Sequence, residues 1–197
     1  FIATIEELDG GEPTGNEKLI FPRYHQMRSV RRLVADAREN GPGERYLIQH
    51  SAGSGKSISI AVLAHQLAFL HDEDDASVFD TVIVVTDRRV LDKQIAQVIL
   101  QFEQERGVVA DIEEGATGLE EALASGKRIV VVTLQTFPHV AEAIRKQGER
   151  DFAVIIDEAH SSQTGEYRKH LNDTLSASSL EEATEEDETE DADLEDK

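Results

Sequence analysis

Apolar residues in this chain gather in short continuous runs that alternate with stretches of helical periodicity. The clearest runs are rich in β-branched residues and lie within 80–86, 128–133 and 152–156. Such runs are typical of strands buried on both faces of a parallel sheet. Further strands are predicted at 45–50 and 108–112, and helices at 21–40, 56–70, 90–105, 119–124, 134–146 and 166–175. Strands alternating with helices predict an α/β fold, a parallel sheet with helices on both faces.

Composition and charge divide the chain into three parts. Residues 1–20 contain turn signals such as Gly10-Gly11 and are predicted to be a lead-in segment, and residues 21–175 are predicted to form the domain. Residues 181–197 hold eleven acids and one lysine, a formal charge of −10, which is half of the −20 carried by the whole chain. Acidic runs of this kind are usually solvated, so we expect residues 176–197 to be a disordered tail or insertion.

The same composition excludes several classes of site. The chain has no cysteine, so disulfides and thiolate metal sites are impossible, and a reducing cytoplasmic location is expected. Its seven histidines lack metal-ligand spacing. No apolar run is long enough for a membrane span. The body is acidic too, so nucleic-acid binding would depend on local contacts rather than on a basic field. The chain begins at Phe1, and we expect it to be a piece of a longer protein.

A glycine-rich segment between a predicted strand and a predicted helix has the features of a phosphate-binding loop. Its predicted binding residues are Ala52, Gly53, Ser54, Gly55, Lys56 and Ser57. Glycines let the backbone curl so that N–H groups and a helix N-terminus face a polyphosphate. Lys56 is placed to reach the β- and γ-phosphates, and Ser57 to bind Mg²⁺. The general pattern has glycine six residues before the lysine, where this chain has His50. The alternative is a glycine- and serine-rich turn without a ligand.

Two adjacent acids, Asp157 and Glu158, follow the apolar run at 152–156, about a hundred residues after Lys56. The carboxyl ends of parallel strands meet at one edge of a sheet, so these acids are expected near the glycine-rich segment. Asp157 could hold Mg²⁺ beside Ser57, and Glu158 could orient the water that attacks the γ-phosphate. A helix N-cap is the alternative for two acids at this position. Together the two motifs predict hydrolysis of Mg-ATP.

These motifs resemble motifs I and II of superfamily 2 helicases and translocases. The longer strings at 49–57, 84–94 and 157–163 resemble the motor (R) subunit of type I restriction enzymes, in which histidine commonly stands where this chain has His50. The resemblance covers about residues 21–175. It implies a first RecA-like P-loop NTPase domain that uses ATP and Mg²⁺, with Lys56 and Glu158 as catalytic residues. The implied partners are double-stranded DNA and the methyltransferase and specificity subunits of the restriction complex.

The resemblance also implies roles for residues outside the two main motifs. Gln26 resembles the glutamine that reads the adenine edge, and His160 the residue that couples the ATP site to a second motor domain. Residues implied to contact the DNA backbone are Thr86, Asp87, Arg88, Thr133, Gln135 and Thr136. Ordinary alternatives are a surface position for Gln26 and turn caps for the residues at the strand ends.

Two other functions stay open at this point: the motor of another superfamily 2 DNA or RNA helicase, and a module in which nucleotide only switches conformation. A second RecA-like domain with its arginine finger, a motif III string and a nuclease motif are not found in the sequence. We therefore expect this chain alone to bind ATP weakly and to hydrolyse it poorly.

Overall fold

The computed structural model of the protein describes residues 3–9, 12–51, 53–86, 89–102, 107–112, 116–147 and 150–157. The described strands are β1 (Ala3–Asp9), β2 (Glu12–Ile20), β3 (Thr81–Thr86), β4 (Val109–Ile112), β5 (Ile129–Thr133) and β6 (Phe152–Ile156). The described helices are α1 (Tyr24–Asn40), α2 (Lys56–Ala68), α3 (Arg89–Gln101), α4 (Ala116–Ala124), the 3₁₀ turn η1 (Leu134–Thr136) and α5 (Phe137–Lys146).

The larger sheet has the strand order β4-β5-β3-β6, and all neighbouring strands run parallel. Every residue of β3 and β5 is buried, because these strands lie inside the sheet and helices cover both faces. The predicted α/β fold, with a parallel sheet between two helical layers, is thereby confirmed.

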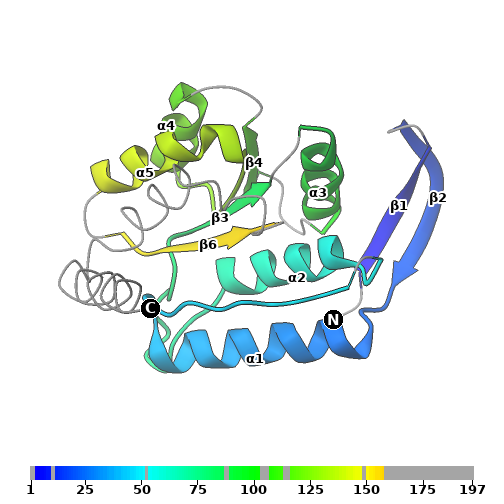
Figure 1. Ribbon diagram of the computed structural model, residues 1–197, viewed down its shortest axis with the longest axis horizontal. Helices are drawn as coiled ribbons and strands as arrows, with labels where there is room; N and C mark the ends of the chain where they lie inside the picture. Colours follow the sequence, from blue (N-terminus) through cyan, green and yellow to red (C-terminus); the bar gives the residue numbers. More distant parts are fainter. Residues whose placement is uncertain are drawn as a thin grey trace, which may run out of the picture.

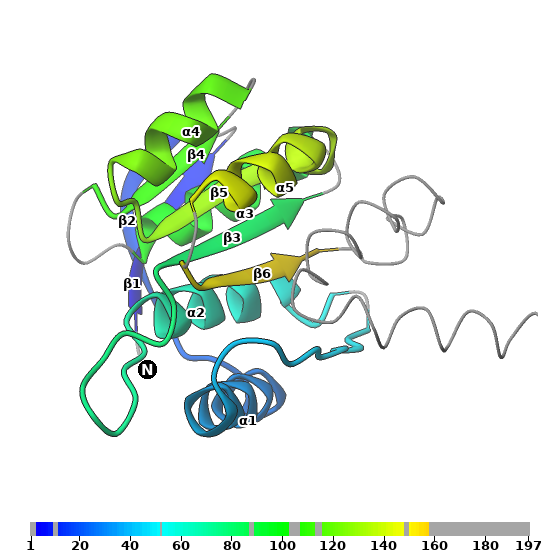
Figure 2. The same ribbon diagram turned by 90° about the vertical axis from the view of Figure 1, so that its left-hand side faces the viewer.

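The two faces of the sheet receive alternate residues of each strand, as the pleat requires. Val82 and Val84 of β3 belong to the core that includes residues of α1, α2 and α3. Ile83 and Val85 belong to the core under α4 and α5. Figures 1 and 2 show α2 and α3 on one face of the sheet and α4 and α5 on the other. A continuous apolar run therefore supplies two cores at once.

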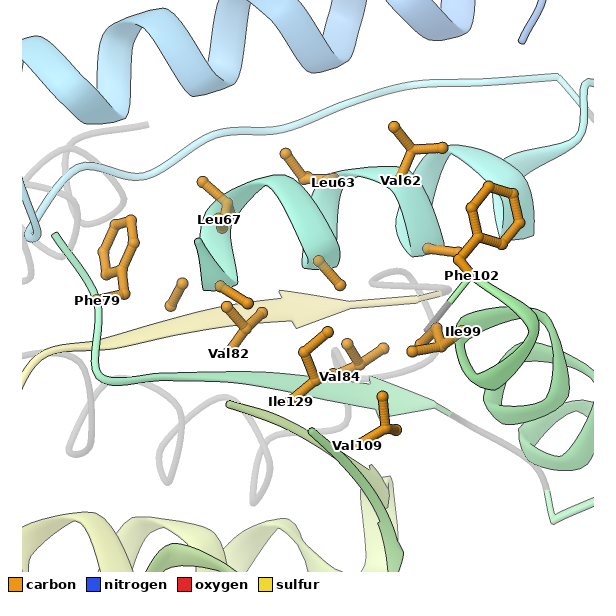
Figure 3. Close-up of a cluster of buried hydrophobic side chains, with 14 of the residues drawn as sticks. Val62, Leu63, Leu67, Phe79, Val82, Val84, Ile99, Phe102, Val109 and Ile129 are labelled. Carbon is orange, nitrogen blue, oxygen red and sulfur yellow. The ribbon is translucent and has the colours of Figure 1, made fainter. Parts of the chain in front are cut away.

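Helix α2 lies directly on the sheet and anchors the segment that precedes it. Figure 3 shows Val82 of β3 beneath α2, while Ile99 of α3 closes the core near Val84 and Ile129. Val82, Val84, Ile99 and Ile129 are fully buried. Burying such a side chain contributes about 1.5–3 kcal/mol, so α2 is firmly packed on the sheet from Ala61 onward.

The strand predicted at 45–50 is wrong, because residues 44–50 have no regular secondary structure. The segment is extended and runs along α1 to the start of α2 (Figure 1). Tyr46, Leu47 and Ile48 are exposed, Leu47 to 86%. An apolar run becomes a strand only where a neighbouring strand can pair with it, and the segment pairs with no described strand.

The lead-in predicted for residues 1–20 contains a β-hairpin instead. Strands β1 and β2 pair antiparallel from Ala3 with Ile20 to Asp9 with Glu12, with an irregularity between Glu6 and Leu8. The hairpin forms its own sheet and lies beside α3. Its strands are largely polar, so the apolar pattern did not reveal them.

The remaining predicted elements agree with the structure within a few residues, apart from two at the end of the chain. The helix predicted at 166–175 and the acidic segment 176–197 lie outside the described residues. No helix in the described part of the chain is both long and apolar enough to cross a membrane.

Candidate functional site

The glycine loop, residues 53–57, joins the extended segment to α2. Gly53 and Gly55 have φ angles of 73° and 82°, values that favour glycine. Gly55 is the N-cap of α2, and its carbonyl accepts hydrogen bonds from the N–H groups of Ile58 at 3.1 Å and Ser59 at 3.3 Å. The predicted arrangement of a glycine turn followed at once by a helix N-terminus is therefore present, with Lys56 as the first helical residue.

The start of α2 is electrostatically suited to an anion. Its first turn contains no acidic residue, and it begins with Lys56 and Ser57. The first N–H groups of a helix have no partner within the helix, and the aligned peptide dipoles add partial positive charge at this end. A polyphosphate at the glycine loop would meet backbone donors, a helix dipole and the Lys56 ammonium together.

Gln26, in the first turn of α1, holds this loop through its side-chain amide. Its Nε2 donates to the carbonyls of Ser54 at 3.2 Å and Gly55 at 2.9 Å, and its Oε1 accepts from the Arg23 N–H at 2.6 Å. In the Gln26 side chain, only the amide nitrogen can donate hydrogen bonds to two carbonyls, and only the amide oxygen can accept one from an N–H group. These partners therefore fix the orientation of the amide. Gln26 is 3% exposed. Its predicted contact with adenine stays a prediction.

The close approach of Gln26 explains why position 55 must be glycine. A Cβ built on Gly55 would lie 2.5 Å from Gln26 Nε2, and the φ angle of 82° is unfavourable for any other residue. The glycine therefore serves the packing of α1 against the loop as well as the turn itself.

His25 makes a second contact with the loop that the sequence did not reveal. Its Nε2 lies 3.1 Å from the Ser54 carbonyl oxygen, the atom that Gln26 also contacts. The His25 ring meets the His50 ring edge to face, with centroids 5.4 Å apart. The only signal was the position of His25 beside Gln26, which is not enough to identify a contact about thirty residues away.

The extended segment before the loop is also attached to α1, because the Tyr46 hydroxyl donates a hydrogen bond to Asp36 Oδ2. This bond lowers the pKa of Asp36 below its ordinary value. Desolvation, followed by the contact with Asp36, raises the pKa of Tyr46 to about 12. Helix α1 thus holds both the loop and its approach.

Asp157 lies at the same edge of the sheet, at the end of β6. Its N–H donates to the Val85 carbonyl at 2.9 Å, which fixes it beside the end of β3. Both strands end here because they run parallel and in register, with Val85 opposite Ile156. The start of α2 lies toward this edge as well (Figure 1). The predicted meeting of the two motifs at one sheet edge agrees with the backbone arrangement.

The threonine group consists of the last residues of β3, β5 and the turn η1, which are Thr86, Thr133 and Thr136. Thr86 and Thr133 pair in register, and all three are buried. Thr133 Oγ1 accepts from the Thr136 N–H at 3.3 Å and lies 3.1 Å from Thr136 Oγ1. Thr86 Oγ1 has no hydrogen-bond partner among the described residues. Thr133 therefore acts as a turn cap here, and the predicted DNA contacts of this group stay predictions.

Of the remaining predicted site residues, Gln135 lies within η1. Five others lie outside the described residues: Ala52, Asp87, Arg88, Glu158 and His160.

The oxygen ligands at this edge fit Mg²⁺ shared with phosphates. Ser57 offers a hydroxyl and Asp157 a carboxylate, and Mg²⁺ usually binds few protein oxygens while keeping waters and phosphate oxygens. In the described part of the chain, no group of three or more His, Asp or Glu residues could hold a metal alone. The donor set suits a nucleotide-bound ion rather than a metal cage built by the protein.

Comparisons with known proteins agree with this geometry. Residues 25–181 match the family model described as SWI2/SNF2 ATPase. The crystal structure of the UvsW helicase from bacteriophage T4 is similar, with a TM-score of 0.54 and 18% sequence identity. The match covers 80% of this chain and 50% of the UvsW chain, so this chain spans about half the length of that protein. At this identity the likeness shows the fold alone. No curated protein matches the sequence.

Proposed function

Because the chain belongs to the SWI2/SNF2 ATPase family and has a helicase RecA-like fold, we propose that it is the first motor domain of a type I restriction enzyme's R subunit. In this proposal the domain binds Mg-ATP and double-stranded DNA, and it works with methyltransferase and specificity subunits to drive DNA translocation.

One observation carries the ATPase part of the proposal. The glycine loop stands at the N-terminus of α2, and Asp157 is held beside the end of β3 by the Val85 carbonyl. Phosphoryl transfer needs little from a protein beyond positioning and charge neutralisation, and these two elements supply both. The finer assignment to the R subunit is supported by the strings around His50, Thr86 and Asp157.

Each residue has a definite task in this proposal. The backbone N–H groups of the glycine loop and the Lys56 ammonium bind the phosphates and stabilise the charge of the transition state. Ser57 and Asp157 hold Mg²⁺, which when bound neutralises the β- and γ-phosphate oxygens. Glu158 orients the attacking water and accepts its proton.

The test uses the intact R subunit assembled with its methyltransferase and specificity subunits. Glu158→Gln should reduce DNA-stimulated ATP hydrolysis by about 10²–10⁴-fold, the usual contribution of a general base, while ATP binding persists. Glu142→Gln is the matched control, since Glu142 is an exposed acid on α5. Hydrolysis is measured by phosphate release, and translocation by displacement of a third strand from duplex DNA.

The outcomes separate the proposed function from its alternatives. Survival of hydrolysis and translocation in the Glu158→Gln protein contradicts the motor assignment and leaves a nucleotide switch. Stimulation by RNA, or activity that does not require the methyltransferase and specificity subunits, indicates another superfamily 2 motor.

A further inference from the structure

Two adjacent side chains of α1 reach the same peptide of the glycine loop. His25 Nε2 and Gln26 Nε2 lie 3.1 Å and 3.2 Å from the Ser54 carbonyl oxygen. Gln26 also contacts the next carbonyl, that of Gly55, at 2.9 Å. The Ser54 carbonyl is therefore directed at α1 and held there from two positions.

This attachment determines where the next N–H group points. The described part of the chain has no cis peptide bond, and in a planar trans peptide the C=O and N–H bonds point in opposite directions. With the Ser54 carbonyl turned toward α1, the Gly55 N–H must point away from α1. That N–H immediately precedes Lys56 and the N-terminus of α2, where backbone donors are expected to meet an anion.

The chemistry of the imidazole makes His25 a donor at this contact. A carbonyl oxygen can only accept, so Nε2 must carry the proton. Both the neutral Nε2–H tautomer and the imidazolium meet this requirement. The edge of one ring against the face of the other at His50 helps to keep the His25 ring in place. His25 is thus oriented from two sides, by a loop carbonyl and by a neighbouring ring.

We infer that His25 is a positioning residue of the nucleotide site: by holding the Ser54 carbonyl, it keeps the Gly55 N–H directed at the phosphates. This inference rests on the proposed function, in which the glycine loop binds ATP. It assigns to His25 an effect on the phosphate end of the nucleotide, exerted through a single peptide group, with no contact between His25 and the nucleotide.

The decisive variants differ in whether they carry a donor at the position of Nε2. His25→Leu keeps the bulk and removes the donor, whereas His25→Gln places an amide nitrogen near the same position. We expect His25→Leu to weaken ATP binding by about two- to tenfold, the range of one net hydrogen bond, and His25→Gln to restore most of the loss. Affinity is measured by displacement of a fluorescent ATP analogue from the full chain.

A second ligand separates positioning from general damage. Inorganic tripolyphosphate contains the phosphate end alone, so its affinity should fall in His25→Leu by the same factor as that of ATP. His139→Ala is the control, because His139 is an exposed histidine on α5, across the sheet from the site. Thermal unfolding of each variant is measured in parallel.

Each result decides the inference. Unchanged affinity for ATP and tripolyphosphate in His25→Leu overturns it, and so does a loss that His25→Gln does not restore. If the His25→Leu protein does not fold, the His25→Asn protein is measured in its place, because the asparagine side chain is too short for its amide to reach the Ser54 carbonyl. If the natural chain binds neither ligand, the proposed function is wrong. The ¹⁵N-detected Gly55 amide shift then decides whether His25 orients this N–H, because the shift should move in His25→Asn and not in His25→Gln.

Discussion

The glycine loop and the threonine group lie toward the same edge of the parallel sheet but use their polar groups differently. The loop is held from outside by side chains of α1, and its carbonyls receive these contacts. The threonines are buried, and Thr133 and Thr136 contact each other. Because the hydroxyls of Thr133 and Thr136 are engaged with each other, we expect the backbone N–H groups of the loop, rather than these two hydroxyls, to meet a ligand at this edge.

The largest effect is expected from Gly55→Ala. The new methyl group would meet Gln26 Nε2 at 2.5 Å and displace the loop, and a shift of about 1 Å in a positioned site can cost 10²-fold in rate. ATP hydrolysis by the assembled R subunit should therefore fall by about 10²-fold, and ATP binding should weaken with it in an equilibrium binding assay. Gly126→Ala is the matched control, since Gly126 has a φ angle of 72° but no neighbour within 4 Å. Equal binding by the two variants would break the proposed link between α1 and the loop.

Substitutions that remove one hydroxyl at a time test the role of the threonine group. Thr133→Val leaves the buried Thr136 N–H without its partner and should lower the free energy of unfolding by about 1–3 kcal/mol. Thr86→Val removes a hydroxyl that has no partner among the described residues, so stability should be kept or increased. Chemical denaturation measures both. If the Thr86→Val protein is as stable as the natural protein but loses DNA-stimulated ATP hydrolysis, this result would support the predicted role of Thr86 in DNA binding.

Gln26→Leu distinguishes a loop contact from adenine recognition. If the amide serves the loop, ATP and GTP affinities should fall together by about tenfold, since two hydrogen bonds to the loop are lost. If the amide reads adenine, ATP affinity should fall while GTP affinity stays constant. Competition binding with both nucleotides gives the answer, and Gln66→Leu, at an exposed position of α2, is the control.

The smallest effect is expected where α1 holds the approach to the loop. The Asp36 pKa is lowered, so its contribution is present above its ordinary pKa of 3.8 and is lost as the pH falls. The Tyr46 pKa is raised, so its contribution is present below pH 10 and is lost as the pH rises through about 12. Tyr46→Phe should leave the thermal midpoint at neutral pH almost unchanged.

Absorbance at 295 nm provides the direct measurement of this contact. Of the three tyrosines in the chain, one should ionise near pH 12, and Tyr46→Phe should remove that step. Asp36→Asn should lower the step only in part, because desolvation is the larger cause of the shift. A step near pH 12 that persists in Tyr46→Phe would show that Tyr46 is not the tyrosine that ionises late.

The sequence predicted those parts of the molecule in which a pattern of residues is compatible with only one kind of secondary structure. The β-branched run around Val84 is buried on both faces, and it could only be an inner strand. The position of Asp157 followed from the end of such a strand. The run around Leu47 is also apolar, but whether it pairs depends on neighbours that the local sequence does not encode.

The rest of the site depended on contacts between distant segments. The Gly10-Gly11 pair between β1 and β2 is a known hairpin signal, yet the polar strands around it lacked an apolar face in the sequence. The contacts of Gln26 and His25 with Ser54 join segments about thirty residues apart. Such contacts depend on the exact approach of α1, which periodicity alone does not specify.

The place of β3 inside the sheet has a consequence for how the chain acquires its structure during synthesis. Val82 pairs with Ile129 on one side and with Ala153 on the other, so β3 gains its two neighbours in separate stages. Until residues 152–156 have left the ribosome, one edge of an uncharged, β-branched segment stays open to other chains. Pairings between such distant segments form slowly. A strand that is fully buried in the finished domain is therefore also a segment that needs protection while the nascent chain is incomplete.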